Sequence, residues 1–340
     1  MYIYGILNSN VSLYLSIPKG LLLLLEESES NGVYTIAYQD ISAVVSDSEM
    51  IDYTHMRKDR LAMFLVRHQK ALENIMSLGH TIIPMRLGTF AKDIEEIKHI
   101  LACGHSTIKD VFNKILNMIE IDVVATWGDF NLVLKEIREG KEIKEFKERL
   151  LASPGGVTVD DQMKVGLMVK EALDRIREGY SKRIQASLKS VSQAFNAHEL
   201  MDDKMVVNIA FLIDKDRRED FDKKVEELNT EFAEKLNFRC VGPLPPYSFY
   251  TLEIKTLNYE DVDWAKKKLG ILNDITSKNE LKKAYQRQAL STHPDRNPNM
   301  PCVEKEFDEV NKAYKILADY CAANEQANQK ENAMLVRVRE

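Results

Sequence analysis

Gly242-Pro243-Leu244-Pro245-Pro246-Tyr247-Ser248-Phe249 is the most constrained segment of the chain. Its three prolines fix their own φ angles near −65° and remove three backbone donors. Each residue that precedes a proline is also held in extended geometry. A mostly apolar run, 238–241, comes before this segment, and an alternating run, 250–255, follows it. We therefore predict a stiff extended corner between two strands, which no regular helix or ladder crosses. On the residues alone, this corner could equally be a purely structural element.

Three further segments accompany the corner, namely Tyr2-Ile3-Tyr4-Gly5-Ile6, Ile83-Pro84-Met85-Arg86-Leu87-Gly88-Thr89-Phe90 and Thr126-Trp127-Gly128. In this order, with a helix expected over 61–78, they resemble the GvpL/GvpF family of gas vesicle proteins across roughly 1–255. Leu244 and Leu87 stand where that family usually has Trp and Phe, and Thr126 where it often has Glu. The motif residues, structural or interacting, are Tyr4, Gly5, Pro84, Arg86, Gly88, Thr89, Trp127, Gly128, Gly242, Pro243, Pro245, Pro246, Tyr247, Ser248 and Phe249.

This resemblance implies an accessory protein of gas vesicle formation. Such a protein would bind the small hydrophobic shell subunit, or other gas vesicle accessory proteins, during nucleation and assembly. Exposed apolar patches would shield the aggregation-prone subunit before it polymerises. The expected location is the cytoplasm and the gas vesicle.

Hydrophobic periodicity predicts an α+β fold built from two small α/β units. We expect ferredoxin-like sheets with helices, a long helical hairpin between the units, and an all-α domain at the end. The predicted strands are 2–7, 33–45 with a break at Asp40, 81–85, 122–137, 205–213 and the two runs that flank the corner. The predicted helices are 56–78, 94–101, 108–118, 143–151, 159–200 and 220–235.

Residues 263–320 differ from the rest because they are helical in pattern and have no strand signal. His293-Pro294-Asp295 follows Leu281-Lys282-Lys283-Ala284-Tyr285 and precedes Asn311-Lys312-Ala313-Tyr314-Lys315-Ile316-Leu317. The combination resembles a J-domain, the module of DnaJ-type co-chaperones. The resemblance implies that His293-Pro294-Asp295, with the basic residues Lys282, Lys283 and Arg287, contacts a DnaK-type ATPase and triggers ATP hydrolysis in that partner.

Some residues of this segment depart from the J-domain pattern. Gln288 replaces the usual Leu, and Ser291 and Thr292 replace the usual Lys-Tyr before the histidine. The missing lysine lowers the summed positive charge on which association rates depend. Two interpretations therefore stay open, an active co-chaperone module and a degenerate docking or packing domain. The predicted domains are 1–152, 153–258 with the long helix, 259–322 as the J-domain-like domain, and 323–340 as a tail.

Composition excludes several classes of protein. The net charge of −6 gives no electrostatic reason to expect nucleic acid as a partner. Four scattered cysteines without a CxxC pair favour reduced thiols. There is no basic stretch of a signal peptide at the N-terminus, and apolar runs such as 21–25 are far shorter than the ~20 residues of a membrane helix. We expect no membrane partner.

Catalytic and metal sites are weakly indicated. Glu95, His99 and Cys103 recur at helical spacing, with His105 nearby, a set that could suit zinc. A solvent-facing helix end closed by Gly104 is the favoured reading, with no metal and no cofactor. Arg86 could bind an anion, although a carboxylate or carbonyl partner is favoured. No nucleophile elbow, P-loop or GxGxxG is present, so we expect no enzyme. The alternative function is a general J-domain co-chaperone whose α/β part binds clients.

Overall fold

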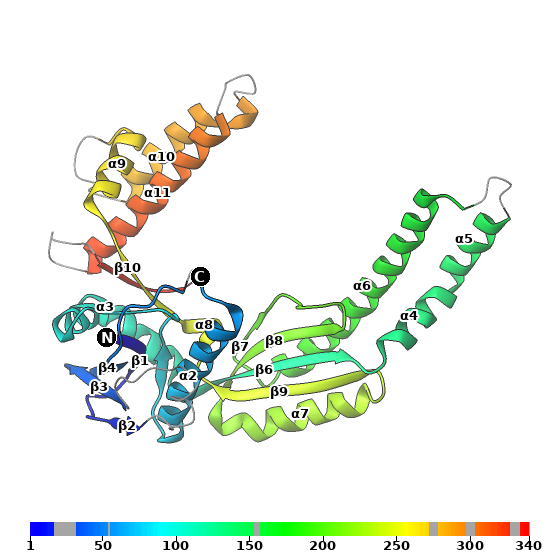
Figure 1. The fold of residues 1–340 in the computed structure, drawn as a ribbon, viewed down its shortest axis with the longest axis horizontal. Coiled ribbons are helices and arrows are strands. Elements are labelled where there is room, and N and C mark those ends of the chain that lie inside the picture. The colour runs from blue at the N-terminus through cyan, green and yellow to red at the C-terminus, as the bar shows by residue number, and fades with distance from the viewer. Residues whose placement is uncertain are drawn as a thin grey trace. The chain divides into compact units, whose positions relative to one another are not determined.

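The computed structural model describes residues 1–16, 32–53, 55–152, 157–271, 278–296, 303–326 and 334–339. The apolar run 21–25 lies outside the described residues. Two compact units form, one from 1–114 together with 250–340 and the other from 115–249. The fold is mixed α/β with a helical C-terminal region (Figure 1). None of the described helices is long and apolar enough to cross a membrane.

The first unit is built on a five-stranded sheet of order β2-β3-β4-β1-β5. Its strands are β1 (Tyr2–Leu7), β2 (Tyr14–Ser16), β3 (Gly32–Tyr38), β4 (Ile41–Ser46) and β5 (Ile82–Pro84). Neighbouring strands run antiparallel. Every residue of β1 and β4 is buried, so the centre of the sheet is covered on both faces. Helix α2 (Lys58–Ser77) buries Phe64, Leu72 and Ile75 in this unit.

Helix α3 (Ile94–Ile115) corrects one prediction. Two helices separated at Gly104 were expected, but one helix runs through that glycine. A Cβ added at Gly104 would lie 2.8 Å from the Val336 side chain. Only glycine leaves room for the Val336 side chain at this position. This close packing offsets the loss of about 1 kcal/mol of helix stability that glycine causes relative to alanine.

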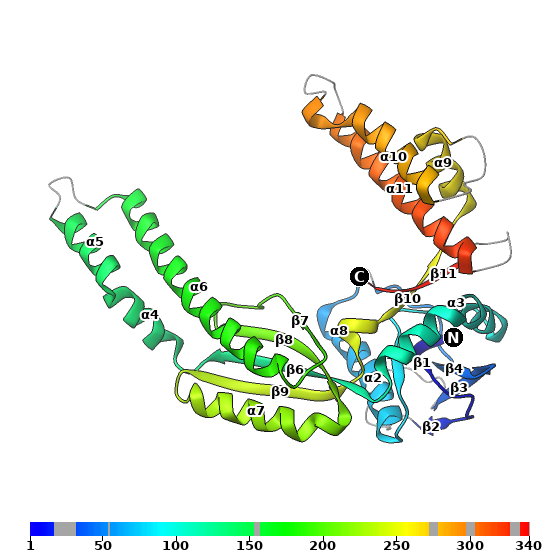
Figure 2. The same cartoon turned by 180° about the vertical axis from the view of Figure 1, so that it is seen from behind.

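The second unit contains an antiparallel four-stranded sheet of order β7-β8-β6-β9. Its strands are β6 (Met118–Trp127), β7 (Ala194–Ala197), β8 (Met205–Asp214) and β9 (Leu236–Leu244). Helix α6 (Val159–Lys189) and helix α7 (Arg218–Glu231) bury Ile184, Leu188, Phe221 and Leu228 in this unit. Figure 2 shows α6 continuing past the sheet, where α4 (Phe130–Glu139) and α5 (Lys141–Leu151) lie against it. The pairing of α5 with α6 is the predicted hairpin, whereas α4 was not predicted as a helix.

Three predictions for this unit are wrong. The strand expected over 122–137 ends at Trp127, because the Asp129 carboxylate accepts the Leu132 N–H and starts α4. The helix expected to reach residue 200 ends at Lys189, and β7 follows. The ladder crosses Gly242 and Pro243, since β9 continues to Leu244. That strand lies at the edge of the sheet and carries a register shift there, the two settings in which proline is tolerated.

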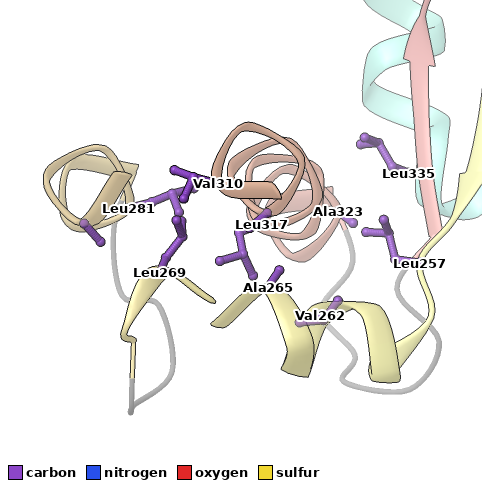
Figure 3. Close-up of a cluster of buried hydrophobic side chains, with 11 residues drawn as sticks. Leu257, Val262, Ala265, Leu269, Leu281, Val310, Leu317, Ala323 and Leu335 are labelled. Atoms are coloured by element: carbon purple, nitrogen blue, oxygen red, sulfur yellow. The ribbon is translucent and has the colours of Figure 1, made fainter. Parts of the chain in front are cut away.

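The C-terminal helices are α9 (Tyr259–Leu269), α10 (Lys278–Thr292) and α11 (Val303–Gln326), with a short 3-10 turn η2 (Pro294–Arg296). Leu269, Leu281, Val310 and Leu317 meet in one buried core (Figure 3). Strand β10 (Leu252–Thr256) precedes these helices. Within the segment 323–340, predicted as a tail, β11 (Met334–Val338) forms and pairs with β10.

Candidate functional site

The His-Pro-Asp turn follows directly from the way α10 ends. Pro294 cannot continue the helix, and η2 begins at that residue. The hydroxyls of Ser291 and Thr292 donate to the Gln288 carbonyl oxygen at 2.8 and 2.9 Å. Both hydroxyls therefore bond back to the preceding turn of the same helix. The residues that depart from the J-domain pattern thus make local contacts at the end of α10.

His293 and Asp295 play different parts in this turn. The His293 ring packs edge-on against Phe307 of α11, with centroids 5.3 Å apart. Its Nδ1 accepts the backbone N–H of Asp295 at 3.1 Å. The Asp295 side chain is 89% exposed. His293 therefore holds the turn in place, whereas the Asp295 carboxylate is presented to solvent.

Three basic side chains lie on the exposed surface of α10, namely those of Lys282, Lys283 and Arg287. The helix is held to α11 by Tyr285, whose hydroxyl donates to Asn311 Oδ1 at 2.8 Å and whose ring lies 4.4 Å from that of Tyr314. The basic residues and Asp295 thus belong to one rigid element and its C-terminal turn. This arrangement suits an acidic protein surface.

The proline corner is anchored by a buried carboxyl group that the sequence reasoning missed. Glu120 of β6 is 1% exposed. Its Oε2 accepts the Ser248 N–H at 2.8 Å, and its Oε1 lies 2.7 Å from Ser248 Oγ. Burial raises the pKa of Glu120 to about 8. The signal in the sequence is the pair of acidic residues, Glu120 and Asp122, in an otherwise apolar strand.

Two more polar side chains converge on the corner. His198 Nε2 lies 3.0 Å from Ser248 Oγ, and Asn196 donates its amide N–H to the Ser248 carbonyl oxygen at 3.0 Å. Burial also raises the pKa of Asp122, while the nearby His198 lowers it. Helix α8 (Tyr247–Tyr250) starts at the corner. The polar network therefore fixes the point at which the chain leaves the second unit.

The motif glycines are required by close backbone contacts. Gly242 has φ +149°, and a Cβ there would lie 2.9 Å from the Glu120 carbonyl oxygen. A Cβ at Gly128 would lie 2.3 Å from the Glu234 carbonyl oxygen. Trp127 is buried, and its indole N–H donates to the Asp203 carbonyl oxygen at 3.2 Å. These residues occupy the two ends of the β6–β9 pair.

The remaining motif residues lie in the first unit. The Tyr4 hydroxyl pairs with Ser46 Oγ at 3.1 Å, and Gly5 faces Pro84 in the β1–β5 ladder. Gly88, with φ +84°, and Thr89 form the turn after β5, where Thr89 Oγ1 donates to the Arg86 carbonyl oxygen at 2.6 Å. Arg86 Nη1 lies 3.5 Å from Glu253 Oε2. The family motifs thus form three separate structural clusters.

The side chains considered for zinc do not converge. Cys103 Sγ lies 3.5 Å from His99 Nε2, whereas His105 Nε2 lies 2.8 Å from Asp40 Oδ1. Burial raises the pKa of the Cys103 thiol, which disfavours the thiolate that zinc binds. Across the described ranges, three or more histidine, cysteine or acidic side chains nowhere gather in a way that could hold a metal ion.

Comparison with known proteins identifies two regions of the chain. Residues 1–251 match the family "Gas vesicle synthesis protein GvpL/GvpF", and residues 267–323 match the DnaJ domain. Gas vesicle protein F of Microcystis aeruginosa is 22% identical over 254 residues, which cover 74% of this chain and 98% of that protein. A chaperone protein DnaJ of Salinibacter ruber is 47% identical over 51 residues, 15% of this chain and 13% of that protein.

A solved structure shows the same fold in the larger part of the chain. The crystal structure of the gas vesicle protein GvpF from Anabaena sp. PCC7120 superposes with a TM-score of 0.61 and 22% identity, covering 73% of this chain and 96% of that one. The C-terminal helices lie beyond the matched family region. The chain therefore belongs to the GvpL/GvpF family of gas vesicle synthesis proteins and carries a DnaJ domain at its C-terminal end.

Proposed function

We propose that this chain is an accessory protein of gas vesicle formation that brings a DnaK-type chaperone to gas vesicle proteins. The family region would bind the hydrophobic shell subunit or other accessory proteins during nucleation and assembly. The DnaJ domain would deliver the chaperone to the same complex. The expected location is the cytoplasm, at growing gas vesicles.

The observation that carries the proposal is the exposed Asp295 carboxylate at the end of a basic helix, in a chain of this family. The ATP-hydrolysing site would belong to the chaperone, and this chain would act through binding. A degenerate packing domain would have no need to present Asp295 together with Lys282, Lys283 and Arg287. The active interpretation therefore has more support than the degenerate one.

Single-turnover ATP hydrolysis by a purified DnaK-type chaperone tests the recruiting step. The full chain should accelerate hydrolysis, and Asp295→Asn should abolish that acceleration. Asp308→Asn is the matched control, because Asp308 is an exposed carboxylate of α11 in the same domain. Equal acceleration by the full chain and by Asp295→Asn would contradict chaperone recruitment through this turn.

Binding to gas vesicle proteins is tested separately. The full chain, and a chain that ends at residue 251, are immobilised and offered purified shell subunit or accessory proteins. Because the family match ends at residue 251, both chains should retain the partner. If neither chain retains a gas vesicle protein while the DnaJ domain still acts on the chaperone, the general co-chaperone function replaces the proposed one.

A further inference from the structure

Two short segments lie outside both family matches, residues 252–266 and 324–340. They contain β10 and β11, which pair antiparallel from Leu252 with Val338 to Thr256 with Met334. The DnaJ helices are therefore inserted between the two strands of one ribbon. Neither the gas vesicle family nor the DnaJ domain accounts for this element.

One face of the ribbon belongs to the core of the DnaJ helices. Leu335 is 3% exposed, and it lies in the same hydrophobic cluster as Leu257 and Leu317 (Figure 3). Asp319 of α11 adds a charged contact, since its Oδ1 lies 2.8 Å from Arg337 Nη1 and its other oxygen pairs with Lys255. The Asp319 side chain is only 10% exposed, whereas the side chains of Arg337 and Lys255 are 42% and 40% exposed, so the carboxylate is buried under two half-exposed basic groups.

The other face of the ribbon belongs to the sheet domain of the same unit. Successive strand residues point to opposite faces, so Val336 points away from the core that holds Leu335. Val336 is fully buried, and its side chain occupies the space left by the missing Cβ of Gly104 in α3. The glycine in the middle of α3 is explained by this contact.

Backbone and charged contacts extend the same attachment to the end of β5. The Arg86 N–H donates to the Leu252 carbonyl oxygen at 2.8 Å, and Met85 forms a parallel bridge with Leu252. Glu253 lies 2.8 Å from Arg337 and 3.5 Å from Arg86. Charged side chains from the turn after β5, the ribbon and α11 thus form one chain of contacts.

We propose that the β10–β11 ribbon is a rigid joint that fixes the DnaJ helices on the N-terminal sheet domain, and that β11 is the strand that locks it. A single connection through β10 would leave the helices free to rotate about one segment of backbone. A second strand, packed against α3 by Val336 and against α11 by Leu335 and Arg337, removes that freedom. The joint holds the His-Pro-Asp turn in one orientation whichever partner the domain binds, so the inference goes beyond the proposed function.

Backbone 15N relaxation of the full chain tests the joint. The amides of α10 and α11 should report the same rotational correlation time as those of β1 and β4. Val336→Asp should shorten the correlation time of the helices by about twofold or more, because a small domain then tumbles on its own. The amides of β1 and β4 should change far less. Arg339→Glu is the matched control, since Arg339 is exposed and lies three residues after Val336.

Gly104→Val provides a second variant in case Val336→Asp fails to fold. It places methyl groups where the Val336 side chain lies while keeping the sequence of β11 intact. The amide shifts around His293 should stay native in both variants, which shows that the DnaJ helices remain folded. The joint is ruled out if the helices of the unmodified chain already tumble faster than β1 and β4. It is also ruled out if a variant with folded DnaJ helices leaves their correlation time unchanged.

Discussion

The Glu120 carboxyl group holds Ser248 by two hydrogen bonds, from the backbone N–H at 2.8 Å and with the hydroxyl at 2.7 Å. The two residues are 128 positions apart in the sequence. This contact ties the Pro-Pro-Tyr-Ser-Phe end of the family motif to the second strand from the edge of its sheet. The contact explains why the motif places Ser248 here, because the Glu120 carboxyl group is 1% exposed and its burial without a hydrogen-bond partner would cost free energy.

Ser248→Ala should destabilise the second unit by about 1–3 kcal/mol, because it leaves a buried carboxyl oxygen without its hydroxyl partner. Urea denaturation followed by circular dichroism measures the change. Ser187→Ala on α6, which lies outside this cluster, is the control and should stay within about 0.5 kcal/mol. Equal stabilities of the two variants would show that the contact with Glu120 has no energetic weight.

Glu120 should also make the stability of the folded state fall as the pH rises toward 8. Its pKa is about 8 in the folded state and about 4.3 in an unfolded chain. The folded state therefore binds the proton more tightly, and the stabilising effect of protonation, complete below pH 4.3, is lost as the pH rises through 8. Between pH 6 and 9 the urea midpoint of the natural chain should fall more than that of Glu120→Gln. Parallel midpoint curves would contradict this assignment.

His68 should produce the opposite dependence in acid. Burial lowers the pKa of His68 to about 4, from an ordinary value of 6.5. The folded state holds the imidazole neutral, so stability is lost as the pH falls from 6.5 through 4. His68→Gln should remove part of that acid sensitivity, whereas His55→Gln, at an exposed position, should leave it intact. Thermal unfolding at pH 7 and pH 4.5 distinguishes these outcomes.

Glycine-to-alanine substitutions should have opposite signs at two positions of the second unit. Gly128→Ala should destabilise by about 2 kcal/mol or more, since the new methyl group meets the Glu234 carbonyl oxygen. Gly166→Ala should stabilise by up to about 1 kcal/mol, because this residue lies inside α6 and, apart from its chain neighbours and the backbone of its own helix, no described atom lies within 4 Å of the added Cβ. Chemical denaturation of both variants checks the pair, and a stable Gly128→Ala would refute the contact.

The basic surface of α10 should control association with the chaperone. Reversing the charges of Lys282, Lys283 and Arg287 to Glu should lower the association rate by tenfold or more at low salt, with a smaller effect at high salt. Stopped-flow binding measures this rate. Reversal of Lys144 and Lys147, exposed or half-exposed on α5 of the second unit, is the matched control. If the association rate depends on Lys144 and Lys147 but not on the charges of α10, the chaperone binds at another surface of the chain.

The sequence predicts the locally determined parts of this fold well. The helix at 58–77 follows from its apolar periodicity, and the His-Pro-Asp turn from proline chemistry. The elements that were missed depend on distant partners. In the sequence, Gly104 is typical of a helix end, and only the packing of Val336 against it explains why the helix continues. Strand β11 forms because its backbone pairs with that of β10. Glu120 could not be connected with Ser248, because the pairing of β6 with β9 brings them together.

The central claim is that one chain connects gas vesicle proteins with a DnaK-type chaperone. Quantitative mass spectrometry of complexes captured on the tagged chain, from cells that express a gas vesicle gene cluster, tests it most directly. The natural chain should bring down both the shell subunit or accessory proteins and the chaperone. Asp295→Asn should retain the gas vesicle proteins and lose the chaperone. Capture of the chaperone without gas vesicle proteins, or of gas vesicle proteins with no chaperone from either chain, would contradict the claim.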